Sequence, residues 1–273
     1  MPESIPFAST VVLLRPGMDV FLMKRHGKSG FMGGVHVFPG GKVDEDDRAA
    51  DWTEVIGAAA VSPLTTKVPG LTETDARALI VASIRETLEE AGVILGGPAP
   101  TGLEAVQQKL NASEMRFLDW VRETNVRLDT DRLAFFDHWI TPPIEKKRFD
   151  TFFFAAAIPE GQTATSVSRE TTEGVWMQPA EAVDRYRAGE ITLAPPTCTT
   201  LLRLSRFRDP GEAIESLRRR PVATMLPKVS QENGQMILML PGHPGYGPHE
   251  GELDPEGPSC VRMNGGKWFP ETR

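Results

Sequence analysis

Three glutamates lie close together in the segment RETLEEAGV, near the middle of the first half of the chain. On an α-helix of 3.6 residues per turn, Glu86, Glu89 and Glu90 fall within an arc of about 100°. The apolar side chains of the same helix fall on the opposite side: Ile80, Val81, Ile84, Leu88 and Ala91. Clustered carboxylate oxygens are the ligands that Mg²⁺ and Mn²⁺ prefer, with water and phosphate oxygens at the remaining positions. The spacing therefore predicts a site for a divalent cation.

This cluster destabilises the helix that carries it unless a cation is nearby. Glu86 and Glu90 are like charges one turn apart, which costs a few tenths of a kcal/mol, and the helix macrodipole disfavours anions near a C-terminus. Arg85, four residues before Glu89, offsets part of this cost. Charged helix faces are usually only solvated surface. The functional interpretation is favoured here by the upstream segment Phe38–Gly41, because a strand that ends in a tight glycine turn can bring backbone close to phosphates or to a metal.

Strands and helices must position the carboxylates. The carboxylate helix is predicted over 72–92, with Thr74 as its N-cap and Gly92 as the left-handed residue that ends it. Before it, the sequence predicts strands over 7–14, 20–24 and 35–38, a weak helix over 48–60 and a loop over 62–70. After it, the sequence predicts helices over 103–110, 113–124, 179–188, 196–206 and 211–219, strands over 132–140, 149–158 and 173–177, a hairpin of 222–226 with 236–240, and a loop-like tail after residue 241. The mixture predicts an α+β fold with a mixed sheet covered by helices.

Gly41 and the segment 85–93 together resemble the Nudix box, G-x5-E-x7-R-E-U-x-E-E-x-G-U, in which U is apolar. The second half matches except at Thr87. About 30 extra residues separate Gly41 from Arg85, as in the coenzyme A diphosphatase-like branch of the family. Counting back from Arg85 puts Arg77 where the first Glu of the box belongs, and Glu73 and Asp75 are the candidates to replace it.

The resemblance covers about residues 7–204 and implies a Nudix-type α/β/α sandwich. Residues 1–207 are then one domain, with insertions at about 43–71 and 101–126, and residues 208–273 are an extension expected to pack on it. It also implies hydrolysis of a nucleoside diphosphate derivative with Mg²⁺ or Mn²⁺. The substrate suggested by this branch is CoA or acyl-CoA, cleaved to 3′,5′-ADP and (acyl-)phosphopantetheine.

The same resemblance assigns roles to individual residues. Glu86 and Glu90 become the principal metal ligands, Glu89 a third ligand or the base, and Arg85 the residue that orients them. Glu89, Glu90 and Arg85 are thus the catalytic candidates. The substrate-binding candidates are the loop residues Gly40 and Gly41, the possible phosphate-binding side chains Arg25 and Arg148, and the carboxylates Glu170 and Glu173.

Two alternatives stay open. One is a Nudix pyrophosphatase acting on ADP-ribose or a reduced dinucleotide such as NADH. The other is a non-catalytic Nudix-like module that binds nucleotides and regulates. Such modules usually lose box carboxylates, whereas this chain keeps all three, so the sequence favours an enzyme.

The composition agrees with a folded soluble enzyme. The chain has 273 residues and a formal net charge of −7, which argues against a nucleic-acid partner. It contains two cysteines and no apolar run long enough to cross a bilayer, so we expect a cytoplasmic protein without a membrane partner. The expected partner is a small nucleotide diphosphate, and the sequence sets no oligomeric state.

Overall fold

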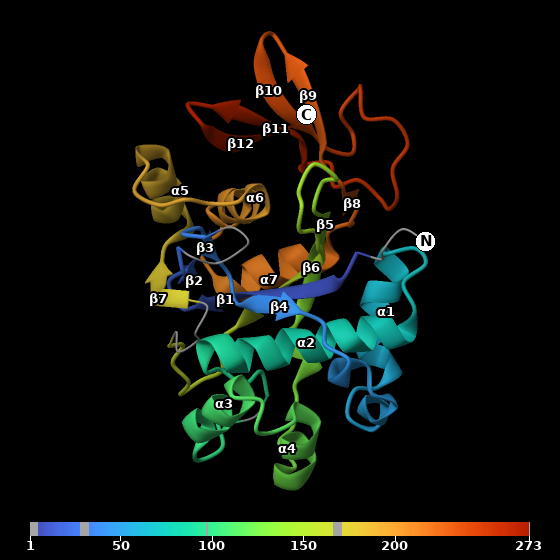
Figure 1. Cartoon of the computed structure of the whole chain (residues 1–273), viewed down its shortest axis with the longest axis vertical. Coiled ribbons are helices and arrows are strands. Elements are labelled where there is room, and N and C mark those ends of the chain that lie inside the picture. Colours follow the sequence, from blue (N-terminus) through green and yellow to red (C-terminus); the bar gives the residue numbers. More distant parts are fainter. Residues whose placement is uncertain (1–4, 28–32, 97, 166–170, 273) are drawn as a thin grey trace.

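The computed structural model describes residues 5–27, 33–96, 98–165 and 171–272 (Figure 1). Its centre is a mixed sheet with the strand order β3-β2-β1-β6-β5-β8, in which β4 also pairs with β1 and β7 with β2. These strands span Phe7–Arg15 (β1), Asp19–Arg25 (β2), His36–Val37 (β3), Gly40–Lys42 (β4), Ala134–Ile140 (β5), Asp150–Ala157 (β6), Thr171–Met177 (β7) and Thr224–Met225 (β8). The central pair, β1 and β6, is parallel, and β1 is antiparallel to β2 and β4.

Helices cover both faces of this sheet. The α-helices are Ala58–Lys67 (α1), Glu73–Ala91 (α2), Leu103–Asn111 (α3), Phe117–Thr124 (α4), Pro179–Ala188 (α5), Pro195–Leu204 (α6) and Pro210–Arg219 (α7). On one face, Val11 and Leu13 of β1 pack in the core that α1, α2 and α4 share. On the other face, Val12 and Leu14 join the core of α5, α6 and α7. Because a strand buried on both faces is apolar throughout, the unbroken run from Val11 to Leu14 follows from this layering. The predicted α+β sandwich is confirmed.

Part of the predicted local structure around α2 is wrong. The segment 62–70, expected to be a loop, lies largely in α1, where Val61 and Leu64 are buried against the core of α2. That burial outweighs the helix-breaking tendency of Pro63. The N-cap of α2 is Thr72 rather than Thr74, since the Thr72 hydroxyl accepts a hydrogen bond from the Asp75 N–H at 3.1 Å.

The C-terminal extension departs most from the prediction. It forms a second, antiparallel sheet of β9 (Lys228–Glu232), β10 (Gln235–Met239), β11 (Pro258–Asn264) and β12 (Lys267–Thr272). The expected hairpin of 222–226 with 236–240 does not form, because β8 pairs in parallel with β5 and β10 pairs with β9 and β11. The tail is not simply loop-like either. Asn233–Gly234 and Gly265–Gly266, all at positive φ, turn the two hairpins of the sheet.

The second sheet lies beside α6 and the loop that joins β5 to β6, at the end of the molecule remote from α3 and α4 (Figure 1). Its residues Leu240 and Val261 belong to the same buried core as Val12 and Leu14 of β1. Within the described ranges, no helix combines the length and the apolar character that crossing a membrane requires.

Candidate active site

The carboxylates lie in the last two turns of α2, which is fastened at both ends. Thr72 caps the first turn, and Gly92, at φ 67°, donates its N–H to the Leu88 carbonyl at 3.0 Å and ends the helix. Between these caps, the Ser9 hydroxyl of β1 donates to the Leu79 carbonyl at 2.8 Å. The helix therefore has a fixed position over β1, with its C-terminal end beside β4.

Arg85 is the centre of the site. Its Nε and Nη2 donate to the two carboxylate oxygens of Asp47 at 2.9 and 2.8 Å. Its Nη1 donates to Glu86 at 2.8 Å and to Glu89 at 3.1 Å, and its Nη2 also donates to the Lys42 carbonyl at 3.1 Å. A planar guanidinium with five donors is suited to such a fork-shaped set of contacts. Arg85 thus holds two of the three glutamates in place.

The glycine turn at β4 contacts the same carboxylates. The Gly40 N–H donates to Glu90 Oε2 at 2.8 Å. A Cβ on Gly41 would lie 2.5 Å from the carboxylate carbon of Glu86, and one on Gly40 would lie 2.3 Å from the Ser9 carbonyl oxygen. Any larger residue would therefore displace either the carboxylate or β1. The structure thus brings Gly40 and Gly41 into direct contact with the predicted metal ligands.

Burial and like charge make these carboxylates hard to ionise. Desolvation raises the pKa of Glu86 well above its ordinary value; Arg85 opposes this shift, and Glu90 and Glu89 add to it. Desolvation likewise raises the pKa of Glu89, against the opposing charge of Arg85. Burial alone lowers the pKa of Arg85, but its bonds and charges from Asp47 and the glutamates outweigh that effect and raise it, so Arg85 stays protonated. Ionising these carboxylates is therefore unfavourable, and a bound cation would lower that cost by neutralising their charge.

The donor set fits a hard divalent cation. In the described part of the chain, Glu86 Oε2 and Glu89 Oε1 accept no hydrogen bond, while their other oxygens accept from Arg85. No group of three or more acidic, histidine or cysteine side chains in the described ranges is already arranged around a cation position. Arg85 donates to one oxygen each of Glu86 and Glu89, and the Gly40 N–H donates to Glu90. Oxygen ligands on one helical stripe are the type of ligand that Mg²⁺ and Mn²⁺ take.

The partner of Arg85 is Asp47, which the sequence analysis did not single out. Asp47 is 2% exposed and lies in a short 3₁₀ turn, Asp46–Arg48, at the start of the segment 43–71 that was predicted as an insertion. Desolvation raises its pKa, and Arg85 opposes that shift. Glu73 and Asp75, the two residues predicted to replace the first Glu of the box, do not hold Arg85. Asp75 pairs with Arg48, and Glu73 lies in the first turn of α2.

A simple count would have found Asp47. Counting forward from Gly41, rather than back from Arg85, the position of the first box Glu is residue 47. The extra residues therefore follow this position. Arg77 cannot replace it because eight helical residues, about 12 Å, separate it from Arg85. Its Nε donates instead to the Ile56 carbonyl at 3.0 Å.

Helix α3, in the segment 101–126 predicted as a second insertion, supports the same turn of α2 from its other side. The side-chain amides of Gln107 and Asn111, both on α3, donate to the Glu89 carbonyl at 3.1 and 2.9 Å. Gln107 is 2% exposed. Carbonyls in the last turn of a helix have no partner within the helix, so these two donors satisfy a group that would otherwise be left unpaired.

The segments 43–71 and 101–126, predicted as insertions, also contact each other. The ring of Trp52, which is 1% exposed, lies 5.5 Å from that of Phe117. Arg116 forms a forked ion pair with Asp46, the neighbour of Asp47. The two segments that support the C-terminal end of α2 therefore also pack against each other.

The other predicted residues lie farther along the strands. Arg25 ends β2, and Glu173 is exposed on β7, where it pairs across the ladder with Lys24 of β2. Arg148 lies in the loop between β5 and β6, and its Nε donates to the Thr141 carbonyl at 2.8 Å. Glu170 lies outside the described residues.

Comparison with known proteins identifies the family. The sequence model of the NUDT19 Nudix domain matches residues 8–204. The chain belongs to the Nudix hydrolase family. A relative from Xenopus laevis, acyl-coenzyme A diphosphatase NUDT19, is 26% identical over 288 aligned residues that cover 90% of this chain and 76% of the relative. The human protein of the same name is 29% identical and covers 83% of this chain and 72% of its own.

A solved structure agrees with this membership at the level of the fold. A Nudix hydrolase from Alicyclobacillus acidocaldarius superposes with a TM-score of 0.66 at 24% identity, covering 80% of this chain and 98% of that one. The family membership inferred from the box residues is thereby confirmed.

Proposed function

We propose that this Nudix hydrolase cleaves the diphosphate linkage of CoA or acyl-CoA, giving 3′,5′-ADP and (acyl-)phosphopantetheine. Glu86, Glu89 and Glu90 would bind Mg²⁺ or Mn²⁺ for this reaction. The observation that carries the proposal is the set of three box glutamates on the last turns of α2, directly against the glycine turn of β4. The relatives named acyl-coenzyme A diphosphatase, which align with most of this chain, support the choice of substrate.

The protein side of the chemistry follows from the contacts around Arg85. A bound divalent cation supplies charge neutralisation for the diphosphate and lowers the pKa of a coordinated water. Arg85, held by Asp47, fixes the directions of Glu86 and Glu89, so the ligands need little reorganisation. Gly41 lets the Glu86 carboxylate lie directly against the backbone of β4, and Gly40 lets the same turn lie against β1. Glu89, with its raised pKa, is the candidate third ligand or general base.

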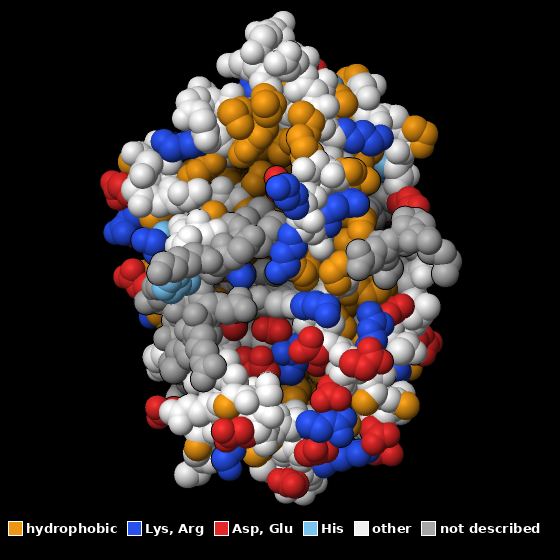
Figure 2. All heavy atoms as spheres, viewed as in Figure 1, with side chains coloured by type: hydrophobic (Ala, Val, Ile, Leu, Met, Phe, Trp, Pro, Cys, Tyr) orange, Lys and Arg blue, Asp and Glu red, His pale blue; other side chains and the backbone are white. Residues whose placement is uncertain are grey.

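The surface around the cluster has the charges that such a substrate requires. Figure 2 shows acidic side chains gathered in a hollow of the front face, with Lys and Arg side chains above them and an apolar area higher still. A diphosphate neutralised by metal fits the acidic part, and additional phosphates fit the basic part. A non-catalytic module would not need the three intact glutamates.

The decisive experiment is a substrate panel with a matched pair of variants. The purified protein is incubated with Mg²⁺ or Mn²⁺ and CoA, acetyl-CoA, ADP-ribose, NADH or dNTPs, and products are separated by chromatography. Glu90→Gln should lose at least about 100-fold in kcat, because a ligand charge is removed. Glu73→Gln, at the exposed start of the same helix, should change kcat by less than twofold.

Each result has a defined meaning. Hydrolysis of CoA or acetyl-CoA at a higher kcat/KM than ADP-ribose or NADH supports the proposed substrate. Preference for ADP-ribose or NADH refutes the substrate while keeping the site. Full activity in Glu90→Gln refutes the site itself. Isothermal titration with Mn²⁺ then separates loss of metal from loss of chemistry, since a ligand substitution must weaken binding.

A further inference from the structure

We propose that the loop between β5 and β6 is a subsite for the 3′-phosphate of CoA, with Arg148 as the residue that binds it. We call residues 141–149 the basic loop. The inference rests on the proposed substrate and goes further, because it assigns recognition of the phosphate that distinguishes CoA from ADP-ribose and NADH.

The basic loop is an ordered turn rather than an open connection. The Thr141 N–H donates to the Phe149 carbonyl at 2.9 Å, and the Phe149 N–H donates to the Thr141 hydroxyl at 3.1 Å. Within the loop, the Glu145 N–H donates to the Pro142 carbonyl at 3.1 Å. Two prolines, Pro142 and Pro143, restrict its backbone further. A loop closed in this way can hold a side chain in one direction before ligand arrives.

Arg148 is held at one edge of its guanidinium only. Its Nε donates to the Thr141 carbonyl at 2.8 Å, and the side chain is half-buried. In the part of the chain that the structure describes, neither Nη group has a protein partner. Other arginines, such as Arg116 and Arg220, use these groups to bind carboxylates. A guanidinium anchored through Nε with both Nη groups available is preorganised for forked binding of a phosphate.

The charge around Arg148 favours an anion although the whole chain is acidic. Lys146 and Lys147 precede it and are exposed, and Lys147 Nζ lies 5.3 Å from the ring centre of Phe149. Glu145 is the one acidic residue among positions 141–149. Three cations thus face a single carboxylate in a protein whose formal net charge is −7. Such a local excess attracts a dianion more strongly than a neutral ribose hydroxyl.

The sheet brings the basic loop to the same region as the glutamates. Ser9 of β1 pairs with Gly41 on one side and with Phe152 of β6 on the other. Neighbouring strands lie about 4.8 Å apart, so the backbones at Gly41 and Phe152 are about 10 Å apart. Gly41 touches Glu86, and Arg148 lies four residues before Phe152. Four residues extend at most about 14 Å, so the Arg148 side chain, the ribose and its phosphoester links together cover the remaining span to the glutamates.

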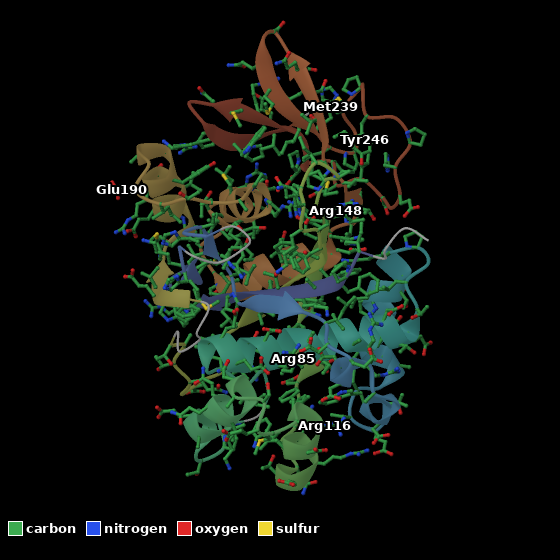
Figure 3. All side chains as sticks on the ribbon, viewed as in Figure 1. Arg85, Arg116, Arg148, Glu190, Met239 and Tyr246 are labelled. Atoms are coloured by element: carbon green, nitrogen blue, oxygen red, sulfur yellow. The ribbon has the colours of Figure 1, made fainter. Side chains whose placement is uncertain are left out.

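Figure 3 shows the order of these parts in one view. Arg148 lies between α2, which carries Arg85, and the C-terminal sheet, which carries Met239. A CoA molecule whose diphosphate lies at the glutamates would direct its 3′-phosphate toward the basic loop. The pantetheine arm would leave from the other phosphate.

The test compares CoA with dephospho-CoA, which lacks only the 3′-phosphate. In the wild-type protein, KM for CoA should be about 10- to 100-fold lower than for dephospho-CoA. The free energy contributed by a pair of charge-assisted hydrogen bonds corresponds to that change in affinity. Arg148→Gln should remove this difference by raising KM for CoA alone, with kcat changed less than about twofold. Arg148→Lys should give an intermediate KM for CoA, since it keeps the charge but loses the fork and the Nε anchor.

Arg132→Gln is the matched control, because it removes an exposed arginine at the opposite end of β5 that is paired with Asp129. It should leave the ratio of the two KM values unchanged. Equal KM values for CoA and dephospho-CoA in the wild type, or an equal rise for both substrates in Arg148→Gln, would overturn the subsite and leave the proposed function intact. Failure of the wild type to hydrolyse either compound would instead refute the proposed function.

Discussion

Replacing Asp47 with Asn should destabilise the protein and slow the reaction together. Asp47 is 2% exposed, and both of its oxygens accept from Arg85, at 2.9 and 2.8 Å. Removing one partner of a buried ion pair costs about 3–5 kcal/mol, but Arg85 keeps Glu86 and Glu89, so we expect about 2–3 kcal/mol. For a chain of this size that free energy corresponds to a fall in Tm of about 4–10 °C. We also expect kcat to fall about tenfold or more, because Arg85 would no longer fix the two glutamates.

The structure provides a control in the same insertion. Asp44 also approaches Arg85, at 3.7 Å, but its side chain is 60% exposed, so Asp44→Asn should cost less than about 0.5 kcal/mol. Urea unfolding monitored by tryptophan fluorescence measures the free energy of unfolding, and turnover with Mg²⁺ measures kcat. Asp47→Glu, which keeps the charge, should recover part of the lost kcat. If Asp47→Asn unfolds at the same urea concentration as Asp44→Asn and retains full kcat, the assigned role of Asp47 is wrong.

Three further predictions test the contacts of the site. First, the pKa of Glu86 is raised by desolvation and by its acidic neighbours, so the folded state binds its proton more tightly than the unfolded state does, and metal-free stability should fall as pH rises from the ordinary value of 4.5 through the raised pKa. Glu86→Gln should flatten this fall in a series of Tm measurements without metal while abolishing turnover; an unchanged pH slope would contradict the assignment. Second, Gly41→Ala should reduce kcat about 10-fold or more because its Cβ would meet the Glu86 carboxylate at 2.5 Å, whereas Gly57→Ala, which meets nothing within 4 Å, should not. Third, Gln107→Leu should lower the free energy of unfolding by about 0.5–1.5 kcal/mol, since it removes one buried donor to the Glu89 carbonyl while Asn111 still donates to it, and equal urea midpoints for variant and wild type would count against this contact.

Much of the helix that carries the glutamates could be predicted from the sequence, because helical periodicity and capping residues are read from neighbouring positions in the chain. Helical periodicity places Glu86, Glu89 and Glu90 on one stripe, and Gly92 adopts the left-handed conformation expected of it. The apolar run of β1 and its glycine-turned neighbour are likewise local signals. The element pattern predicted an α+β fold, and the resemblance of the box residues to the Nudix family implied the Nudix-type sandwich.

The errors arose where a local signal competed with burial or pairing. Pro63 and its polar neighbours favour a loop, but Val61 and Leu64 are buried in the core beside α2 and the segment is helical. The Asn233–Gly234 turn was a readable hairpin signal in the tail. The partner strands of β8 and β10, in contrast, depend on which edges of the two sheets are available, and no local pattern contains that information.

The sequence by itself determined the candidate site: three carboxylates on one helical face beside an arginine, next to a glycine turn. Only the tertiary structure decided what holds them. Asp47 reaches Arg85 across 38 positions of the chain, and Gln107 reaches the Glu89 carbonyl from a separate insertion. Contacts of this kind depend on where insertions fold back against the core. Spacing along a helix is set by backbone geometry, whereas these supporting contacts are set by packing between segments that the sequence places far apart.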